Sequence, residues 1–294
     1  MLRESWTNIL ANLDAALDLC RSLQLTDHVE RSRFLEYRQH LARLVETLQA
    51  DGQTGARAVF EADRLKSIVT LTESAQFADL LSFLRSADPN ALTDKLVHVL
   101  GGPVLPSDED PNSNQARNIL FELNLASKMW KAGLAPELGE HPDLVIEVAK
   151  KRLLIQCKRP FSTNGAHRAL RDAKDQLLRD LTRAPAGSRG IIALSLSRLL
   201  NPGNEIFVYG AEMRARRDLA DRLQSTADQL LSKWSGPGRK IIGMICHVIT
   251  PAIDEGVGLW MMVQQTNVHG FAGRGTFDDK AFRSVYGALE TIWY

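Results

Sequence analysis

The apolar residues of this 294-residue chain change their spacing at a stretch rich in proline and glycine, GGPVLPSDEDPNSN, residues 101–114. Before this stretch, apolar side chains such as Leu41 and Leu44 recur at helical intervals with few β-branched runs. After it, helical and strand-like segments alternate. Because prolines and glycines end periodic structure, the stretch is predicted to be a linker. The predicted organisation is an all-α N-terminal domain over residues 1–105 and a second domain over residues 114–294.

The two parts differ in charge. Residues 1–111 hold 11 basic and 17 acidic residues, whereas residues 112–294 hold 25 basic and 18 acidic residues. The basic part is therefore the one expected to attract a polyanion. The acidic helical part is expected to self-associate or to bind a regulatory protein instead. A chain that is 44% hydrophobic and 24% charged belongs to neither the disordered nor the fibrous class.

Cysteine usage and hydropathy favour a cytoplasmic protein without a membrane partner. The three cysteines, Cys20, Cys157 and Cys246, lie far apart and form no CxxC pair, as is usual in a reducing compartment. Acidic and amide residues interrupt the N-terminal segment where a signal peptide needs an apolar run. No stretch approaches the roughly 18 apolar residues of a membrane span.

The second part is predicted to be an α/β fold, in which a mixed β-sheet is flanked by helices. The order of its segments is α-β-β-α-β-α-β-β-α. Helices are expected at residues 114–133, 166–183, 211–234 and 279–292, and strands within 141–150, 151–160, 190–197, 240–250 and 257–266. The first two strands form a predicted hairpin around Lys150-Lys151-Arg152.

The second strand of this hairpin carries two polar side chains on one face. Side chains alternate between the faces of a strand, so Gln156 and Lys158 point to one side while Ile155 and Cys157 point into the core on the other. A buried core thiol is therefore the favoured interpretation of Cys157, rather than a nucleophile. An amide and an ammonium group are thus expected side by side.

Two acidic residues are predicted to approach the same place. Asp143 follows Pro142 at the start of the partner strand, from which its carboxylate can reach the same edge of the sheet. Glu122 lies on the preceding helix beside the apolar residues Ile119 and Leu123, so that it can face the sheet. Each motif is common by itself, and its place in this order of elements makes it specific.

The set resembles the PD-(D/E)XK phosphodiesterase superfamily of nucleases in the residues Glu122, Pro142-Asp143 and Gln156-Cys157-Lys158. The resemblance covers residues 114–198 and implies a restriction-endonuclease-like core. It further implies an endonuclease or exonuclease that hydrolyses phosphodiester bonds, mostly in DNA, with Mg²⁺ or Mn²⁺. The chain departs from the family pattern at Gln156, where an aspartate or glutamate is usual.

The resemblance also assigns roles to these residues. Asp143 would be the principal metal ligand, with the side-chain oxygen of Gln156 and the backbone carbonyl of Cys157 completing the protein ligands. Glu122 would bind through water or hold a second ion, and Lys158 would orient the attacking water and offset the charge of the transition state. A neutral Gln156 would raise the metal concentration that the site requires.

The segment after the motif favours nucleic-acid binding. Residues 147–191 hold 11 basic and 4 acidic residues. The phosphate backbone of a nucleic acid is expected to lie along this basic segment. The candidate contacts are Arg159, Arg171, Lys174 and Gln176. The alternative is a solvated helix face whose aspartates pair with these bases.

Two other classes of function remain open. In the first, the nuclease fold binds nucleic acid or a partner protein but no longer cleaves, because Gln156 has abolished the metal chemistry. In the second, the protein is a scaffold whose helical part does the work. Endonucleolytic and exonucleolytic cleavage are not distinguished by the motif, and DNA is favoured over RNA.

Overall fold

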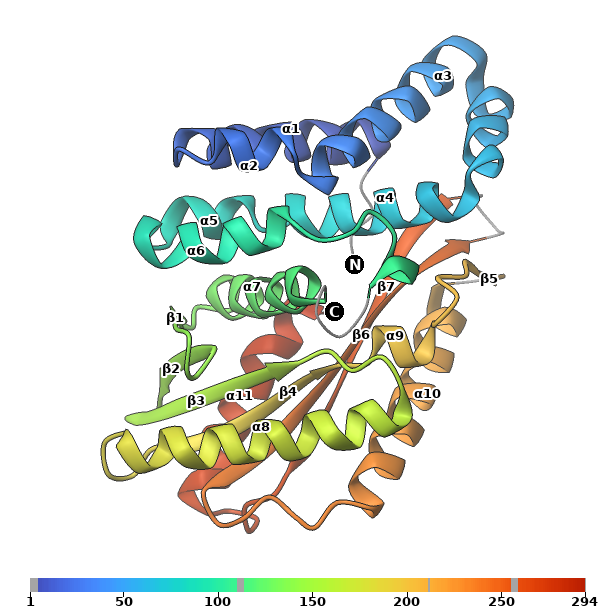
Figure 1. The fold of residues 1–294 in the computed structure, drawn as a ribbon. Helices are drawn as coiled ribbons and strands as arrows, with labels where there is room; N and C mark the ends of the chain where they lie inside the picture. The colour runs from blue at the N-terminus through green and yellow to red at the C-terminus, as the bar shows by residue number, and fades with distance from the viewer. Residues whose placement is uncertain (1–4, 110–113, 211, 255–258, 294) are drawn as a thin grey trace.

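The computed structural model describes residues 5–109, 114–210, 212–254 and 259–293 (Figure 1). The remainder of the predicted linker, residues 110–113, and the first two residues of the predicted strand 257–266 lie outside the described residues. No helix within the described part is long and apolar enough to span a membrane.

The first hundred residues form helices in the part that is described. Polar residues cap several of them: the hydroxyl of Ser5 accepts a hydrogen bond from the backbone N–H of Asn8, and Asp88 caps a helix that begins with Pro89. One long helix is kinked at Gly52, which adopts a positive φ of 66° inside it. The helices are α1 (Trp6–Ser22), α2 (Thr26–Glu30), α3 (Arg33–Ala62), α4 (Arg64–Ala78), α5 (Leu81–Ser86) and α6 (Pro89–Leu100).

The described part of the predicted linker packs against the rest of the molecule. It contains a short 3-10 helix, η1 (Pro106–Asp108), in which Pro106 is buried. The side chain of Glu109 has no exposed surface and pairs with two arginines. These residues are therefore part of the folded structure rather than a free tether.

The rest of the chain is an α/β structure with a mixed sheet, which confirms this coarse prediction. The described residues form one sheet of seven strands in the order β1-β2-β3-β4-β6-β5, and β7 pairs with β6. The strands are β1 (Glu137–Leu138), β2 (Leu144–Val148), β3 (Lys151–Lys158), β4 (Arg189–Ser195), β5 (Phe207–Tyr209), β6 (Ile241–Asp254) and β7 (Leu259–Gly270). The helices are α7 (Gln115–Lys131), α8 (Thr163–Arg183), α9 (Ser197–Leu200), α10 (Glu212–Ser232) and α11 (Phe277–Trp293).

The predicted hairpin is present, with a tighter turn than expected. Strands β2 and β3 are antiparallel, and Ala149 and Lys150 between them both have positive φ angles, as a two-residue hairpin turn requires. Lys151 and Arg152, which were predicted to lie in the turn, belong to β3. Strand β6 also continues through Pro251, beyond the predicted range of 240–250, because β7 pairs along its length.

Helices cover both faces of the sheet, and this arrangement positions the site. Helices α7 and α11 pack on one face, where Ile155 and Cys157 of β3 join the core. Helices α8 and α10 pack on the other face, where Leu154 of β3 joins a second core. Figure 1 shows α7 between the sheet and the helical layer of α4 to α6. One apolar core runs from the N-terminal helices through α7 into the sheet.

Candidate functional site

Asp143 lies at the start of the hairpin, one residue before β2. Its Oδ2 atom accepts hydrogen bonds from Nε2 of Gln156 at 2.5 Å and from the backbone N–H of Cys157 at 2.6 Å. Asp143 and Gln156 are both buried. The register explains the contact: Leu144 pairs with Ile155, so Asp143 stands opposite Gln156 on the neighbouring strand. The structure therefore brings the two residues together at the strand ends, as the sequence indicates.

Glu122 approaches Asp143 from helix α7. Burial and the negative charge of Asp143 raise the pKa of Glu122 to about 7, although the ammonium groups of Lys95 and Lys158 oppose this shift. Burial also raises the pKa of Asp143, against the Cys157 N–H and the charge of Lys158. The two carboxyl groups therefore act on each other, and the pair tends to hold a proton near neutral pH.

Lys158 ends strand β3 and is half-buried. Within the described part of the chain, its ammonium group makes neither a hydrogen bond nor an ion pair. Its positive charge nevertheless opposes the rise in pKa of Glu122, Asp143 and the thiol of Cys157. The ammonium thus favours the ionised form of both carboxyl groups without pairing with either of them in the described structure.

The predicted residues meet at the end of the hairpin rather than on one face of the sheet. Alternation along β3 places Gln156 with Leu154, on the face covered by α8, whereas Glu122 belongs to α7 on the opposite face. Asp143 is their common neighbour. The Cys157 thiol lies in the core on the α7 side, where burial and then the charge of Asp143 raise its pKa well above the usual value. This environment suits a core thiol and not a nucleophile.

A divalent cation fits part of this donor set. The Oε1 atom of Gln156 is buried and has no hydrogen-bond partner among the described residues, which leaves an amide oxygen beside the Asp143 carboxylate. Hard cations bind carboxylate and amide oxygens. Among these residues, however, no three His, Cys, Asp or Glu side chains form a metal-binding group. The candidate set therefore depends on the neutral donors Gln156 and Cys157 beside two carboxylates.

The four candidate contacts for nucleic acid have different surroundings. Arg159 pairs with Glu109 at 3.1 Å. Lys174 donates a hydrogen bond of 2.6 Å to the backbone carbonyl of Gly236, so its ammonium is used within the fold. Arg171 is exposed on α8, and Gln176 of the same helix is half-buried. Of the four, Arg171 is the side chain that presents its charge to solvent.

Sequence reasoning missed Lys95, the closest charged neighbour of Glu122. Lys95 lies on helix α6, and its Nζ atom is 2.7 Å from Oε2 of Glu122. Both side chains are largely buried. A single lysine in an acidic helical region carries no motif, and only the packing of α6 against α7 brings it to the site.

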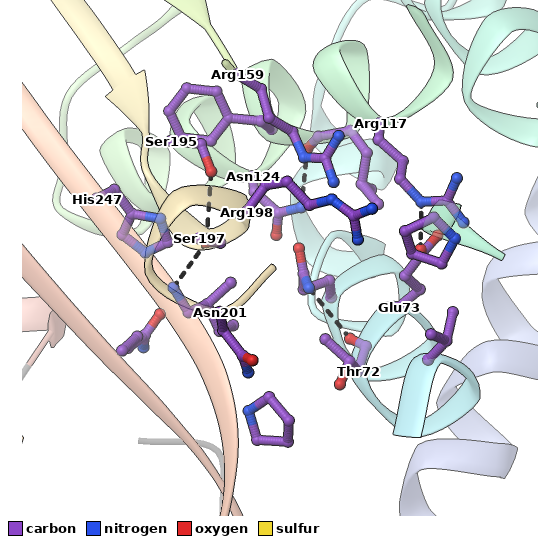
Figure 2. Close-up of a pocket in the computed structure, with 18 of the residues that line it drawn as sticks. Thr72, Glu73, Arg117, Asn124, Arg159, Ser195, Ser197, Arg198, Asn201 and His247 are labelled. Carbon is purple, nitrogen blue, oxygen red and sulfur yellow. Dashed lines mark hydrogen bonds and ion pairs between the residues drawn. The ribbon is translucent and has the colours of Figure 1, made fainter. Parts of the chain in front are cut away.

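A second group of charged residues was also missed. Figure 2 shows a cavity lined by side chains of α4, α7 and the segments after β3 and β4, among them Glu73, Arg117, Arg159 and Arg198. Of these, only Arg159 stands out in the sequence, as part of the basic segment after the motif.

Comparison of the chain with models of protein families, with curated proteins and with solved structures found no match.

Proposed function

We propose that the protein is a metal-dependent phosphodiesterase of the PD-(D/E)XK type that hydrolyses DNA. The observation that carries this proposal is the position of Asp143, which is hydrogen-bonded to Gln156 and Cys157 and lies close enough to Glu122 to raise its pKa. The connectivity α7-β1-β2-β3-α8-β4, with β3 and β4 parallel, supports the same assignment.

The candidate ligands follow from this arrangement. Asp143 would be the principal ligand of Mg²⁺ or Mn²⁺, beside the unpartnered Oε1 of Gln156 and the backbone carbonyl of Cys157. Glu122 would bind through water or hold a second ion. When bound, the ion would polarise the phosphate and lower the pKa of a bound water.

Lys158 supplies the remaining chemistry. Its ammonium ends β3 beside both carboxyl groups and is not engaged by an acidic partner in the described structure. It would orient the attacking water and offset the negative charge that grows on the phosphorus-bound oxygens. A Lys158→Ala change would therefore remove catalysis while leaving the hairpin packing intact.

Cleavage assays test this proposal. The protein is incubated with single- and double-stranded DNA and RNA in Mg²⁺, Mn²⁺ or chelator. We expect metal-dependent cleavage of DNA that falls at least about a hundredfold in Lys158→Ala. Lys233→Ala, at an exposed lysine in the same part of the chain, is the matched control and should cleave normally. Cleavage that persists unchanged in Lys158→Ala would contradict the mechanism.

The second candidate is a nucleic-acid-binding protein that does not cleave. It is favoured by two observations: Gln156 is neutral, and Lys95 already provides a positive charge to Glu122. This version predicts equal DNA binding with Mg²⁺ and with chelator, and no cleavage in either. A scaffold, by contrast, would tolerate Asp143→Ala and Lys158→Ala without loss of function.

A further inference from the structure

A cavity lies at the carboxyl end of β4, beside His247, Ile249 and Pro251 of β6, where helices α4 and α7 close over the sheet (Figure 2). Its volume is about 90 Å³. Since one water needs roughly 10–15 Å³ of such space, the cavity holds several waters or one small polyatomic group. It is too small for a sugar and a base.

A chain of buried ion pairs runs along one side of this cavity, and its members Glu73, Arg117 and Arg159 line the cavity. Arg33 contacts Glu73 at 3.0 Å, and the other oxygen of Glu73 accepts a hydrogen bond from Arg117. Arg117 in turn contacts Glu109 at 3.0 Å, and Glu109 contacts Arg159 at 3.1 Å. Burial opposes ionisation of Glu73, but the charges of Arg117 and Arg33 outweigh it and lower the pKa of Glu73. The chain therefore contains three cations and two anions, and it carries one positive charge in excess.

Arg198 adds a second excess charge. It lies on α9, and its Nη1 atom is buried without a hydrogen-bond partner among the described residues. Burial and the positive charges of Arg159 and Arg117 lower the pKa of Arg198, against the opposing charge of Glu109. Figure 2 shows the guanidinium groups of Arg159 and Arg198 directed into the same space.

The lining also includes the oppositely charged Asp79 and Lys128, which leave the excess charge unchanged, and several neutral groups. The hydroxyls of Ser195 and Ser197 lie 3.4 Å apart, and Ser197 accepts a hydrogen bond from the backbone N–H of Ile249. One hydroxyl hydrogen of the pair is therefore left for a ligand. Burial and the charge of Lys128 lower the pKa of His247 to about 3, so its ring is neutral at physiological pH.

We propose that this cavity binds a phosphate group, held by the guanidinium groups of Arg198 and Arg159 and by the Ser195–Ser197 hydroxyls. Guanidinium groups form strong paired hydrogen bonds with phosphate oxygens, and the excess of two positive charges matches a phosphate dianion. The volume admits the phosphate itself, either free or at the end of a larger molecule that stays outside. The site requires neither a metal ion nor cleavage, and so goes beyond the proposed function.

Titration calorimetry of the whole protein with inorganic phosphate tests the proposal. Chelator is present and ionic strength is held constant with chloride, so that the result does not depend on nuclease activity. We expect saturable binding that is at least about tenfold weaker in Arg198→Gln. Arg217→Gln is the matched control, since it removes the same charge from an exposed position on α10 and should bind phosphate normally.

Thermal unfolding separates a lost site from a damaged fold. In phosphate-free buffer, Arg198→Gln should unfold at a higher temperature than the natural protein, because it relieves the repulsion from Arg159 and Arg117. Added phosphate should stabilise the natural protein but not this variant. Arg198→Lys, which keeps the charge without the planar fork, should bind with intermediate affinity. Equal phosphate binding by the natural protein and Arg198→Gln, or no binding by either, would overturn the proposal.

Binding of short oligonucleotides, measured in the presence of chelator, identifies the molecule that carries the phosphate. If a terminal phosphate strengthens binding of a short DNA relative to the same DNA with a terminal hydroxyl, and Arg198→Gln abolishes the difference, the natural occupant is a nucleic-acid end. If the terminal phosphate adds nothing while inorganic phosphate still binds, the occupant is free phosphate or a small phosphomonoester.

Discussion

The side chain of Gln156 uses its amide nitrogen and leaves its oxygen without a partner in the described structure. The nitrogen donates to Asp143, and this contact fixes the orientation of the amide. A glutamate at this position would be isosteric but could not donate. A third carboxyl group would then join Asp143 and Glu122, and repulsion from Asp143 would replace the hydrogen bond.

We therefore expect Gln156→Glu to lower the stability of the metal-free protein and to strengthen its binding of Mg²⁺. Without metal, the variant should lose about 1–3 kcal/mol of unfolding free energy at pH 8, because Asp143 loses its donor and gains a like charge. With saturating Mg²⁺ this loss should disappear, and Mg²⁺ should bind at least about tenfold more tightly. Denaturant unfolding and calorimetry with and without Mg²⁺ measure both effects.

The control for this prediction is Gln265→Glu. Gln265 is also a buried strand glutamine, but it lies on β7. Its replacement should destabilise the protein equally with and without Mg²⁺. If Gln156→Glu behaves in the same way as Gln265→Glu, the amide oxygen of Gln156 does not face a cation site.

The raised pKa of Glu122 predicts that both the stability of the protein and its affinity for Mg²⁺ depend on pH. Its folded pKa of about 7 is raised from an ordinary value of 4.5, chiefly by burial and then by Asp143. The folded protein therefore binds more protons than the unfolded chain between these values, so metal-free stability should fall as pH rises from about 4.5 to about 7. Mg²⁺ affinity should change in the opposite direction, rising by up to about tenfold per pH unit below pH 7, since protons compete with the ion.

Glu122→Gln isolates this effect. The variant cannot titrate at residue 122, so the difference between its pH profile and that of the natural protein reports Glu122 alone. Calorimetric titration with Mg²⁺ and chemical unfolding at several pH values give the two profiles. Parallel profiles for the two proteins across this range would show that Glu122 does not carry the shared proton.

At the scale of elements, helix α6 contributes to a site that the hairpin and α7 otherwise build. Lys95 of α6 neutralises part of the charge of Glu122, which a bound cation would also do. A helix outside the region of family resemblance thus lies in contact with the candidate metal ligands. This contact connects the helical part directly to the candidate site.

Lys95→Met tests that contact. Removing the ammonium should raise the pKa of Glu122 further, because an opposing positive charge is lost. At pH 8, the variant should bind Mg²⁺ about tenfold more tightly, since the ion no longer meets a nearby positive charge. Calorimetry measures the affinity.

The matched control is Lys131→Met, which breaks the ion pair between Lys131 of α7 and Asp79 and should leave Mg²⁺ affinity unchanged. Equal Mg²⁺ affinity in Lys95→Met and the natural protein would mean that Lys95 does not compete with a cation at Glu122.

At the scale of the whole molecule, the core does not stop at the predicted domain boundary. Buried α7 residues such as Leu123 and Met129 belong to the same apolar cluster as Leu96 of α6 and Ile155 of β3. Each fully buried side chain of this kind contributes about 1.5–3 kcal/mol. Removing the N-terminal helices would expose a large part of α7.

We therefore expect the fragment 114–294 to be unable to fold stably by itself. It should aggregate or show no cooperative unfolding transition, whereas the full chain unfolds in one transition. Circular dichroism during thermal and denaturant unfolding of both proteins checks this. A fragment that unfolds cooperatively, with the midpoint of the full chain, would show that the helical part contributes little to stability.

The local spacing of apolar and polar residues was enough to predict the longer helices and strands. The alternation in LLIQCKRP and the Pro142-Asp143 pair located the hairpin, and the apolar spacing around Ile119 and Leu123 located α7. Short elements such as β1, α9 and β5 were not predicted, because two to four residues carry no measurable period. Their existence depends on neighbours already in place.

The amino-acid sequence by itself determined the mixed α/β arrangement and the approach of Asp143 to Gln156, since alternation and hairpin register are local and follow from backbone geometry. Only the tertiary structure decided that Lys95 meets Glu122, that Lys174 donates to Gly236, and that three arginines line one cavity. These contacts join residues far apart in the chain. They depend on how helices pack across a shared apolar core, and no short-range pattern records that packing.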